Sequence, residues 1–284
     1  MKKLITLALA LSLALSLATT VIANEGKGLD IEGTAASEEK GLDIVVNDVV
    51  ITLDAPVQIY NDTTYVSYWP VVQALYPTAT AVWADDRAVV TAPGLTMEIQ
   101  PGQPYFVTNG RYLYLPDGIR SSDGVLLLPV RTLGAALGAD VSWDAIGNNV
   151  VITAGSGPIT SGDVAYQSDV VYWLSHIINA ESGNQPMSGK IGVGNVVLNR
   201  VASARFPNTV YEVIYQRGQF TPASTGSVLR EPNAESVIAA KLCLDGANSV
   251  GDALYFINPR TSPNSWASRN RPYVATIGGH AFYA

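Results

Sequence analysis

The sequence predicts an α+β protein with two unlike parts, a smaller β-rich part followed by a mainly helical one. Short runs of β-branched residues bounded by Asp, Asn and Gly occur in the first part and are typical of strands. A tryptophan-containing pattern occurs there twice, which indicates a duplicated unit. In the second part, apolar residues recur at helical spacing. The 284 residues are enough for two ordinary domains.

The N-terminal residues have the order of a secretory signal peptide. Lys2 and Lys3 precede an apolar run over 4–18, and small residues follow up to Ala23. The run is shorter than the ~20 residues that cross a bilayer, which disfavours a membrane anchor. We therefore expect residues 1–23 to be removed and the mature protein to be secreted without membrane insertion.

The charge of the exported chain argues against two classes of partner. The full sequence has a formal net charge of −7, and loss of two lysines takes it to −9. An acidic protein has no long-range attraction for nucleic acid or for an anionic membrane surface. The single Cys243 excludes an internal disulfide, so stability must come from hydrophobic burial.

Residues 24–45 are expected to form a flexible leader. They are rich in Glu, Gly, Ser and Ala, and Lys-Gly-Leu-Asp-Ile occurs in them twice. A first strand is the alternative, but low hydrophobicity favours a flexible segment. From Val46 the composition changes. β-Branched runs there predict strands at 49–51, 89–90 and 150–152.

The internal repeat lies within residues 46–154. One copy begins at Tyr65 and contains Trp83, and the other begins at Leu127 and contains Trp143. Each copy predicts a strand, a short helix and a strand, with the tryptophan packing the last strand against the helix. Two copies indicate a duplicated compact domain rather than a solenoid.

The motifs of this repeat are YVSYWPVVQAL at 65–75, LLLPVRTLGAALGADVSWD at 126–144 and NNVVIT at 148–153. They resemble the copper amine oxidase N-terminal-like domains of secreted bacterial proteins. The family name implies copper, but residues 46–154 contain no histidine, and copper sites depend on imidazole ligands. We expect a packing or wall-attachment module with no metal.

The second predicted domain, 169–284, follows a Gly-, Ser- and Pro-containing linker at 155–168. Its first helix has apolar residues on one face, at 170, 173, 174, 177 and 178. The same spacing reaches Glu181, just before Gly183. Desolvation there would raise the pKa of the carboxyl and keep it protonated, as a general acid requires. A Glu that turns to solvent at the helix end is the alternative.

Further helices and strands are predicted after Glu181. Glycines within a helix at 191–201 indicate close packing, because each costs about 1 kcal/mol against alanine. Thr209 and Glu212 fit a capping box that starts a third helix. The remaining predicted elements are a helix at 232–244 and strands at 253–257 and 273–277.

Five motifs run in order through this domain: INAESGNQP (178–186), GKIGVGNVVLNRVASARFPNTVYEVIY (189–215), GQFTP (218–222), ALYFINP (253–259) and IGGHAFY (277–283). They resemble the cell-wall hydrolase family of the spore-cortex-lytic enzyme SleB. The resemblance implies a lysozyme-like α+β fold with Glu181 as the catalytic acid. It also implies peptidoglycan as the substrate, cleaved between N-acetylmuramic acid and N-acetylglucosamine by a lytic transglycosylase.

The resemblance also implies substrate-binding residues. Gln219 and Phe220 match a Gln-Phe pair, with the amide for N-acetyl groups and the ring for stacking on a sugar or packing in the core. Tyr255 and Asn258 are candidates for hydrogen bonds to the glycan or the acid, and plain packing is the alternative for Tyr255. His280, in the Gly-Gly-His motif, either lines the site or is structural.

A single carboxylate suffices for this reaction. Ordinary retaining or inverting glycosidases use two, about 5–9.5 Å apart. In a lytic transglycosylase one Glu protonates the leaving oxygen and then helps remove the proton of the muramyl 6-hydroxyl, which closes a 1,6-anhydro ring. The other acidic residues of the domain are interpreted as caps or solvated residues: Asp169, Glu212, Glu231, Glu235, Asp245 and Asp252.

Alternatives from other classes remain open. A water-using muramidase would pair Glu181 with a second carboxylate supplied by the fold, and a non-catalytic wall-binding protein would need no acid on the apolar face. A zinc amidase is disfavoured, because His176, His280 and Cys243 are too few ligands. His176 lies off the apolar face and is expected to be structural. We expect no cofactor, and neither a helper protein nor the type of wall is assigned.

Overall fold

The computed structural model describes residues 42–284. The predicted signal peptide and most of the predicted leader therefore lie outside the described residues. The β-rich part contains β1 (Asp43–Val46), β2 (Val49–Ile51), β3 (Gln58–Tyr60), β4 (Thr63–Ser67), α1 (Tyr68–Leu75), β5 (Thr80–Ala84), β6 (Arg87–Ala92), β7 (Leu95–Ile99), β8 (Tyr105–Thr108), β9 (Arg111–Tyr114), β10 (Arg120–Ser122), β11 (Val125–Pro129), α2 (Val130–Leu137), β12 (Ala139–Asp144) and β13 (Asn149–Ala154).

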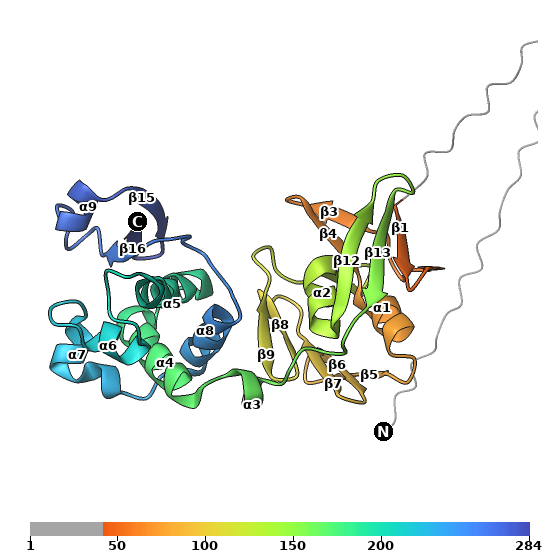
Figure 1. Cartoon of the computed structure of the whole chain (residues 1–284), viewed down its shortest axis with the longest axis horizontal. Coiled ribbons are helices and arrows are strands. Elements are labelled where there is room, and N and C mark those ends of the chain that lie inside the picture. Colours follow the sequence, from red (N-terminus) through yellow and green to blue (C-terminus); the bar gives the residue numbers. More distant parts are fainter. Residues whose placement is uncertain (1–41) are drawn as a thin grey trace, which may run out of the picture. The chain divides into compact units, whose positions relative to one another are not determined.

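The duplication is visible in the order of these elements (Figure 1). Each copy is a hairpin, a helix and a second hairpin: β3-β4-α1-β5-β6 and β10-β11-α2-β12-β13. The copies meet through antiparallel pairing of β4 with β11, in a sheet of order β10-β11-β4-β3. The predicted strand, helix and strand are present, and each predicted strand gains a hairpin partner that the pattern did not show.

The tryptophans of the two copies do not pack as predicted. Trp83 is 60% exposed and Trp143 is 50% exposed. Trp143 shares a face of β12 with Val141, because side chains two residues apart point the same way. Val141 packs against the core, whereas Trp143 lines a pocket together with residues of the first turn of α2. Helix α2 has eight residues and does not cover the indole.

The β-rich part begins earlier than the sequence indicated, so the leader prediction to residue 45 is wrong at its end. β1 pairs in parallel with β13 and antiparallel with β2. Ile44 and Val46 are each 2% exposed and belong to the core. The strand is stabilised by a partner about a hundred residues later in the chain, so local composition could not reveal it.

The predicted linker is bonded to the β-rich part along much of its length. The Ile159 N–H donates to the Ala136 carbonyl at 3.1 Å, and the Gly162 N–H donates to the Asn109 carbonyl at 2.8 Å. The Asn109 amide donates to the Ile159 carbonyl at 3.0 Å. The segment therefore has the composition of a linker, but its backbone is hydrogen-bonded to the β-rich part.

The C-terminal part contains α3 (Gly162–Ala165), α4 (Ser168–Ser182), α5 (Met187–Ala202), α6 (Val210–Tyr215), α7 (Thr221–Thr225), a 3-10 turn (Ser227–Leu229), α8 (Ala234–Leu244), β14 (Tyr255–Ile257), α9 (Trp266–Asn270), β15 (Tyr273–Ile277) and β16 (His280–Tyr283). All predicted helices and strands are found, whereas α3, which lies in the predicted linker, α7, the 3-10 turn, α9 and β16 were not predicted. β16 is the middle strand of the sheet β14-β16-β15. Within residues 42–284, no helix has the length and apolar character needed to span a bilayer.

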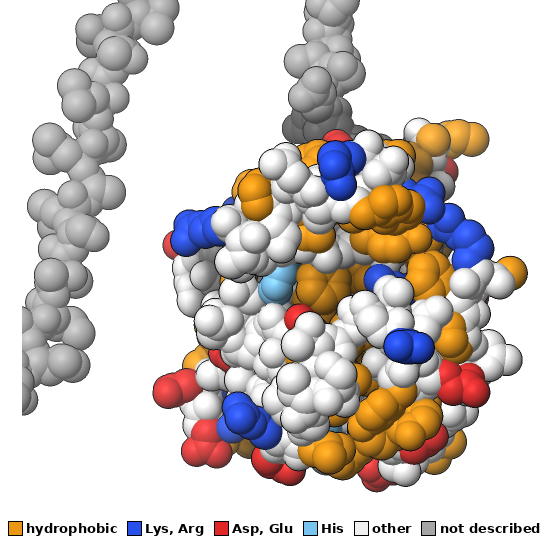
Figure 2. Space-filling view, turned by 90° about the vertical axis from the view of Figure 1, so that its left-hand side faces the viewer, with side chains coloured by type: hydrophobic (Ala, Val, Ile, Leu, Met, Phe, Trp, Pro, Cys, Tyr) orange, Lys and Arg blue, Asp and Glu red, His pale blue; other side chains and the backbone are white. Residues whose placement is uncertain are grey.

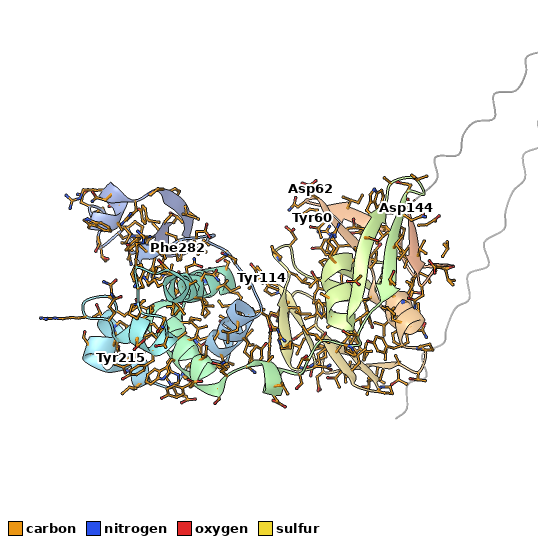
Figure 3. All side chains as sticks on the ribbon, in the orientation of Figure 1. Tyr60, Asp62, Tyr114, Asp144, Tyr215 and Phe282 are labelled. Atoms are coloured by element: carbon orange, nitrogen blue, oxygen red, sulfur yellow. The ribbon has the colours of Figure 1, made fainter. Side chains whose placement is uncertain are left out.

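The glycines of α5 permit close helix packing, as predicted. A Cβ on Gly194 would lie 2.6 Å from Cys243 Sγ of α8 and 3.0 Å from Ile178 Cδ1 of α4. A Cβ on Gly192 would lie 2.8 Å from the ring of Phe282 in β16. Helix α5 therefore touches α4, α8 and the sheet at once (Figures 1 and 3).

Candidate active site

Glu181 lies in the last turn of α4, as the sequence predicts. Ile177 and Ile178, one turn earlier, are fully buried, and Gly183 follows as the C-terminal cap. The Glu181 side chain is partly buried, and burial raises the pKa of its carboxyl. Within residues 42–284, no hydrogen bond or ion pair engages this carboxyl. Such a group holds its proton to a higher pH than an ordinary glutamate and can donate it.

The electrostatic surroundings of Glu181 bear on whether a second acid assists it. A carboxylate a few ångströms away would raise the pKa of Glu181 further by repulsion between like charges. In the described part of the chain, desolvation is the sole cause of the raised pKa. The absence of a contribution from a neighbouring carboxylate among the described residues suits a reaction that uses a single carboxyl group.

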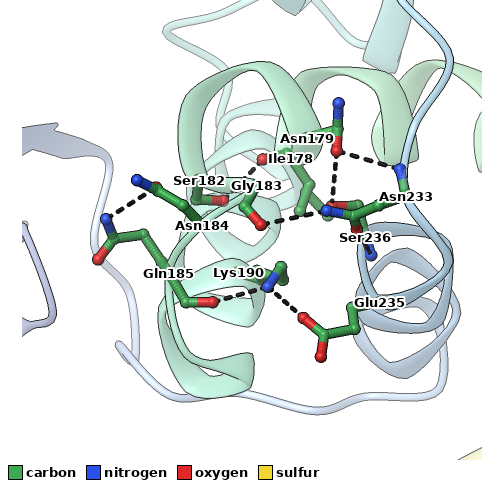
Figure 4. A network of polar contacts seen from close by, with 10 residues as sticks. All are labelled: Ile178, Asn179, Ser182, Gly183, Asn184, Gln185, Lys190, Asn233, Glu235 and Ser236. Carbon is green, nitrogen blue, oxygen red and sulfur yellow. Dashed lines mark hydrogen bonds and ion pairs between the residues drawn. The ribbon is translucent and has the colours of Figure 1, made fainter.

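The end of α4 is fastened to the start of α8 (Figure 4). Asn179 Oδ1 accepts from the Asn233 N–H at 3.1 Å and from the Ser236 hydroxyl at 3.3 Å. The Asn233 amide donates to the Gly183 carbonyl at 3.1 Å. These bonds use groups on both sides of Glu181, so they set the direction of the helix end that carries the acid.

A buried lysine holds the turn that follows α4, and sequence reasoning missed it. Lys190 is 1% exposed, and its ammonium donates to the Gln185 carbonyl and to Glu235, both at 2.7 Å (Figure 4). Gln185 Oε1 in turn accepts from the Gly279 N–H at 2.7 Å. The turn after the acid is therefore tied to α8 and to the β15–β16 hairpin.

The predicted pair Gln219 and Phe220 divides into two roles. Gln219 is exposed and available for hydrogen bonds. Phe220 is 5% exposed and packs 6.3 Å from the ring of Phe256, within the core of this part. The predicted stacking of Phe220 on a sugar is therefore wrong, because core packing covers the ring.

Tyr255 lies on β14 and is partly exposed, beside several aromatic and cationic groups. Its ring is 5.5 Å from Trp266, and the Arg271 guanidinium is 5.3 Å from its centre. Asn258, just after β14, is exposed, and its Oδ1 accepts from the Arg260 N–H at 2.9 Å. Trp266 is 53% exposed and was not singled out from the sequence.

The two histidines differ in their partners. His176 is buried in α4, and its Nδ1 lies 2.8 Å from the Tyr172 carbonyl one turn earlier, so it is structural as expected. His280 is 7% exposed, and its ring lies edge-on to Phe256 at 5.1 Å. Burial lowers the pKa of His280, and its Nδ1 has no hydrogen-bond partner among the described residues.

Arg200 is the centre of this aromatic cluster, and sequence reasoning missed it. It is 4% exposed, and its Nε donates to the Leu254 carbonyl at 2.8 Å. The guanidinium lies 5.1 Å from the Phe220 ring and 5.6 Å from the Tyr255 ring. Burial lowers its pKa to about 10. The helical spacing of Val193, Val196 and Val197 continues to 200, so the argument that selected Glu181 could also have found it.

The sequence-predicted residues are thus only partly brought together. Arg200 contacts both Phe220 and Tyr255, and Phe256 links Phe220 with His280. No ring contact or hydrogen bond within residues 42–284 joins Glu181 to this cluster. Figure 2 shows the face of the C-terminal part that is hollowed near its centre, where an acidic side chain, a histidine and hydrophobic side chains meet.

Most of the other acidic residues agree with their interpretation as caps or solvated groups. The Thr209 hydroxyl accepts from the Glu212 N–H at 3.2 Å, which confirms Thr209 as the N-cap that starts α6. Asp245 is the C-cap residue of α8, as the first of these two interpretations has it, but its carboxyl is not solvated. Its side chain is 1% exposed, is ion-paired with Arg111, and accepts from the Tyr166 hydroxyl and from the Tyr112 N–H at 3.0 Å. Its partners come from distant segments that the local sequence does not show.

No group of three or more His, Cys, Asp or Glu side chains suited to a metal ion is found in the described part of the chain. Two family models match the chain. Residues 184–283 match the model described as Cell Wall Hydrolase, and residues 45–152 match the model described as Copper amine oxidase N-terminal domain. The first match begins three residues after Glu181.

Curated proteins similar to this chain include two spore cortex-lytic enzymes. The one from Bacillus cereus is 35% identical over 117 residues, which are 41% of this chain and 45% of that enzyme. The one from Oceanobacillus iheyensis is 31% identical over 151 residues, which are 51% and 54% of the two chains. The chain therefore spans about half the length of these relatives.

Solved structures with detectable similarity include two catalytic domains. One is the catalytic domain of the germination-specific lytic transglycosylase SleB from Bacillus anthracis, at 33% identity, covering 44% of this chain and 100% of that chain, with a TM-score of 0.40. The other is the catalytic domain of the Bacillus cereus SleB protein, at 34% identity, covering 42% and 92%, also with a TM-score of 0.40.

Proposed function

We propose that this chain, whose residues 184–283 belong to the cell-wall hydrolase family, cleaves the glycan strands of peptidoglycan as a lytic transglycosylase with Glu181 as its acid and base. The observation that carries the proposal is the Glu181 carboxyl, which is partly buried, unpaired within residues 42–284 and raised in pKa by burial alone. The names of the similar proteins supply the substrate, and the carboxyl supplies the chemistry.

In the proposed reaction, protonated Glu181 donates its proton to the oxygen between N-acetylmuramic acid and N-acetylglucosamine as that bond breaks. Positive charge develops on the muramyl ring, and the oxygen of the 6-hydroxyl of the same sugar attacks the carbon that carries it. The Glu181 carboxylate, now without its proton, takes the hydroxyl proton as the 1,6-anhydro ring closes. The proton count is restored, and water is not consumed.

Exposed polar side chains complete the proposed site. Gln219 and Asn258 offer amide groups that match the N-acetyl groups of the glycan in donors and acceptors. Tyr255, held between the guanidinium groups of Arg200 and Arg271, offers a phenol at the edge of β14. His280 is proposed to shape the site as a neutral ring, because burial lowers its pKa.

The substrate class places the reaction outside the cytoplasm, where peptidoglycan lies. The signal peptide predicted at residues 1–23 supports this location. The wall can be spore cortex or vegetative peptidoglycan, so both are used as substrates in the test.

Mass spectrometry of the soluble products tests the proposal. Wild-type protein incubated with purified peptidoglycan should release fragments with 1,6-anhydro-muramyl ends, one water lighter than hydrolysed fragments. The reaction should proceed equally in a chelator, because Glu181 needs no metal ion to donate its proton. Products with only reducing ends would establish a water-using muramidase, and release of no glycan from either wall would support a binding protein.

A further inference from the structure

A pocket lies in the β-rich part and contains none of the residues proposed for the active site. Its volume is about 390 Å³, within the ~300–1,000 Å³ typical of ligand pockets. Residues of the β3–β4 hairpin, the first turn of α2 and strand β12 line it, and Figure 1 shows where these elements lie. Trp143, which was predicted to pack against α2, lines this pocket instead.

An exposed indole forms one wall of this pocket. Trp143 is 50% exposed although the helix that could cover it starts close by. An aromatic side chain that stays in water does not gain the large favourable free energy that its burial would give. Ligand pockets are typically lined by hydrophobic and aromatic side chains together with a few polar groups.

The rest of the lining combines polar and apolar side chains, with one cation and one anion. Thr64 contributes a hydroxyl group, and the Arg131 guanidinium donates to the Val141 carbonyl at 3.4 Å. Asp62 lies at the tip of the β3–β4 hairpin (Figure 3). One cation and one anion with several hydroxyls suit a neutral ligand that both donates and accepts hydrogen bonds. A phosphate polymer would need excess positive charge, which neither this pocket nor the acidic chain provides.

We propose that this pocket binds a sugar ring of a neutral N-acetylated glycan. A pyranose has a face of C–H bonds that stacks on an indole, and its edge carries hydroxyl and amide groups that pair with Arg131, Asp62 and Thr64. The identity of the glycan as a peptidoglycan strand rests on the proposed function. The β-rich part then holds the polymer at a site separate from the cleaved bond.

The other copy of the repeat supplies a matched comparison. Trp83 occupies the equivalent strand position and is 60% exposed. There, Trp69 stands in place of Arg131 as the second residue of the helix. This copy has an exposed indole but no counterpart of the Arg131 guanidinium, so it tests whether a tryptophan alone is enough.

Binding is measured with the full chain carrying Glu181→Gln, which leaves the polymer intact. The protein is sedimented with purified peptidoglycan and titrated with soluble chito-oligosaccharide while tryptophan fluorescence is followed. Adding Trp143→Ala should weaken binding to both probes by roughly tenfold, the loss expected when an aromatic anchor is removed. Arg131→Met should weaken it less, and Trp83→Ala should leave it unchanged. Unchanged melting temperatures verify that each variant is folded.

The proposal is overturned if Trp143→Ala binds both probes like its parent, or if Trp83→Ala causes an equal loss. It is also overturned if moderate salt removes the binding, because a neutral sugar contact is insensitive to screening. Failure of the proposed function is a separate result. In that case the wild-type protein releases no glycan fragments, while dependence of binding on Trp143 is still measured.

Discussion

The ends of helices α4 and α8 each place a carboxyl group out of water, and the two groups meet opposite surroundings. Glu181, at the end of α4, has no hydrogen-bonding or ionic partner within residues 42–284. Asp245, at the end of α8, has a guanidinium, a phenol and a backbone N–H around it, and its side chain is 1% exposed.

This difference shows how withdrawal from water can serve two purposes. A carboxylate with an ionic partner and several donors keeps its charge and holds segments together. A carboxyl without them has a raised pKa, so it holds its proton to a higher pH and is better suited to donate it. Burial alone therefore does not identify a catalytic acid, and the partners decide between the two.

The strongest test of the comparison removes the acid at the end of α4. Glu181→Gln should fold normally, because the amide has nearly the same shape. General acid catalysis contributes about 10²–10⁴-fold, so release of glycan fragments should fall by at least that order. Glu231→Gln, at an exposed position, is the matched control and should stay fully active. A Glu181→Gln rate within a few-fold of wild type would contradict the assignment.

Removal of the acid at the end of α8 should affect stability instead. Asp245→Ala leaves Arg111, whose side chain is 20% exposed, without its partner. Loss of one member of a buried pair costs about 3–5 kcal/mol, and the remaining exposure of Arg111 favours the lower end. The exposed pair Arg87–Glu98 provides the control, since Glu98→Ala should cost less than about 1 kcal/mol. Denaturant unfolding measures both, and equal losses would refute the distinction.

The close packing of α5 against α4 and α8 can be tested at Gly194. An added methyl would lie 2.6 Å from Cys243 Sγ and 3.0 Å from Ile178 Cδ1. Overpacking costs about 1–3 kcal/mol, against a gain of about 1 kcal/mol in helix propensity, so Gly194→Ala should lose up to about 2 kcal/mol. The double variant with Cys243→Ala should recover most of this loss, because the sulfur is the nearest obstacle. Additive losses in the double variant would show that the contact does not limit packing.

The smallest expected effect is the pH dependence of stability at Glu181. Its folded pKa is raised above the ordinary value of 4.5. The stability contribution of this group is therefore fully present below that value and is lost as pH rises through the folded pKa. Glu181→Gln has no proton to lose, so its melting temperature should exceed that of wild type near neutral pH and converge with it in acid. A constant difference across this range would argue against a raised pKa.

Features that depend on neighbours along the chain were predictable. The apolar spacing of α4 located Glu181, and the Thr209 capping box located the start of α6. The glycines of α5 indicated a close contact, although not its partners. Arg200 was equally accessible to this reasoning, because it continues an apolar helical face.

Features that depend on residues far apart in the chain could not be predicted in this way. Phe220 was open to stacking or packing until Phe256 and Arg200 were placed beside it. Trp143 was expected to be covered, but it is half exposed and lines a pocket beside the first turn of α2.

The sequence by itself determined the α+β class, the duplication, the helices around Glu181 and the absence of histidine from the β-rich part, because each depends on local periodicity or composition. Only the tertiary structure decided that β1 joins β13, that Asp245 is paired, that Phe220 is covered and that a pocket opens beside Trp143. The physical reason is that hydrogen-bond partners, ion pairs and burial are set by contacts between distant segments, and one-dimensional patterns do not specify those contacts.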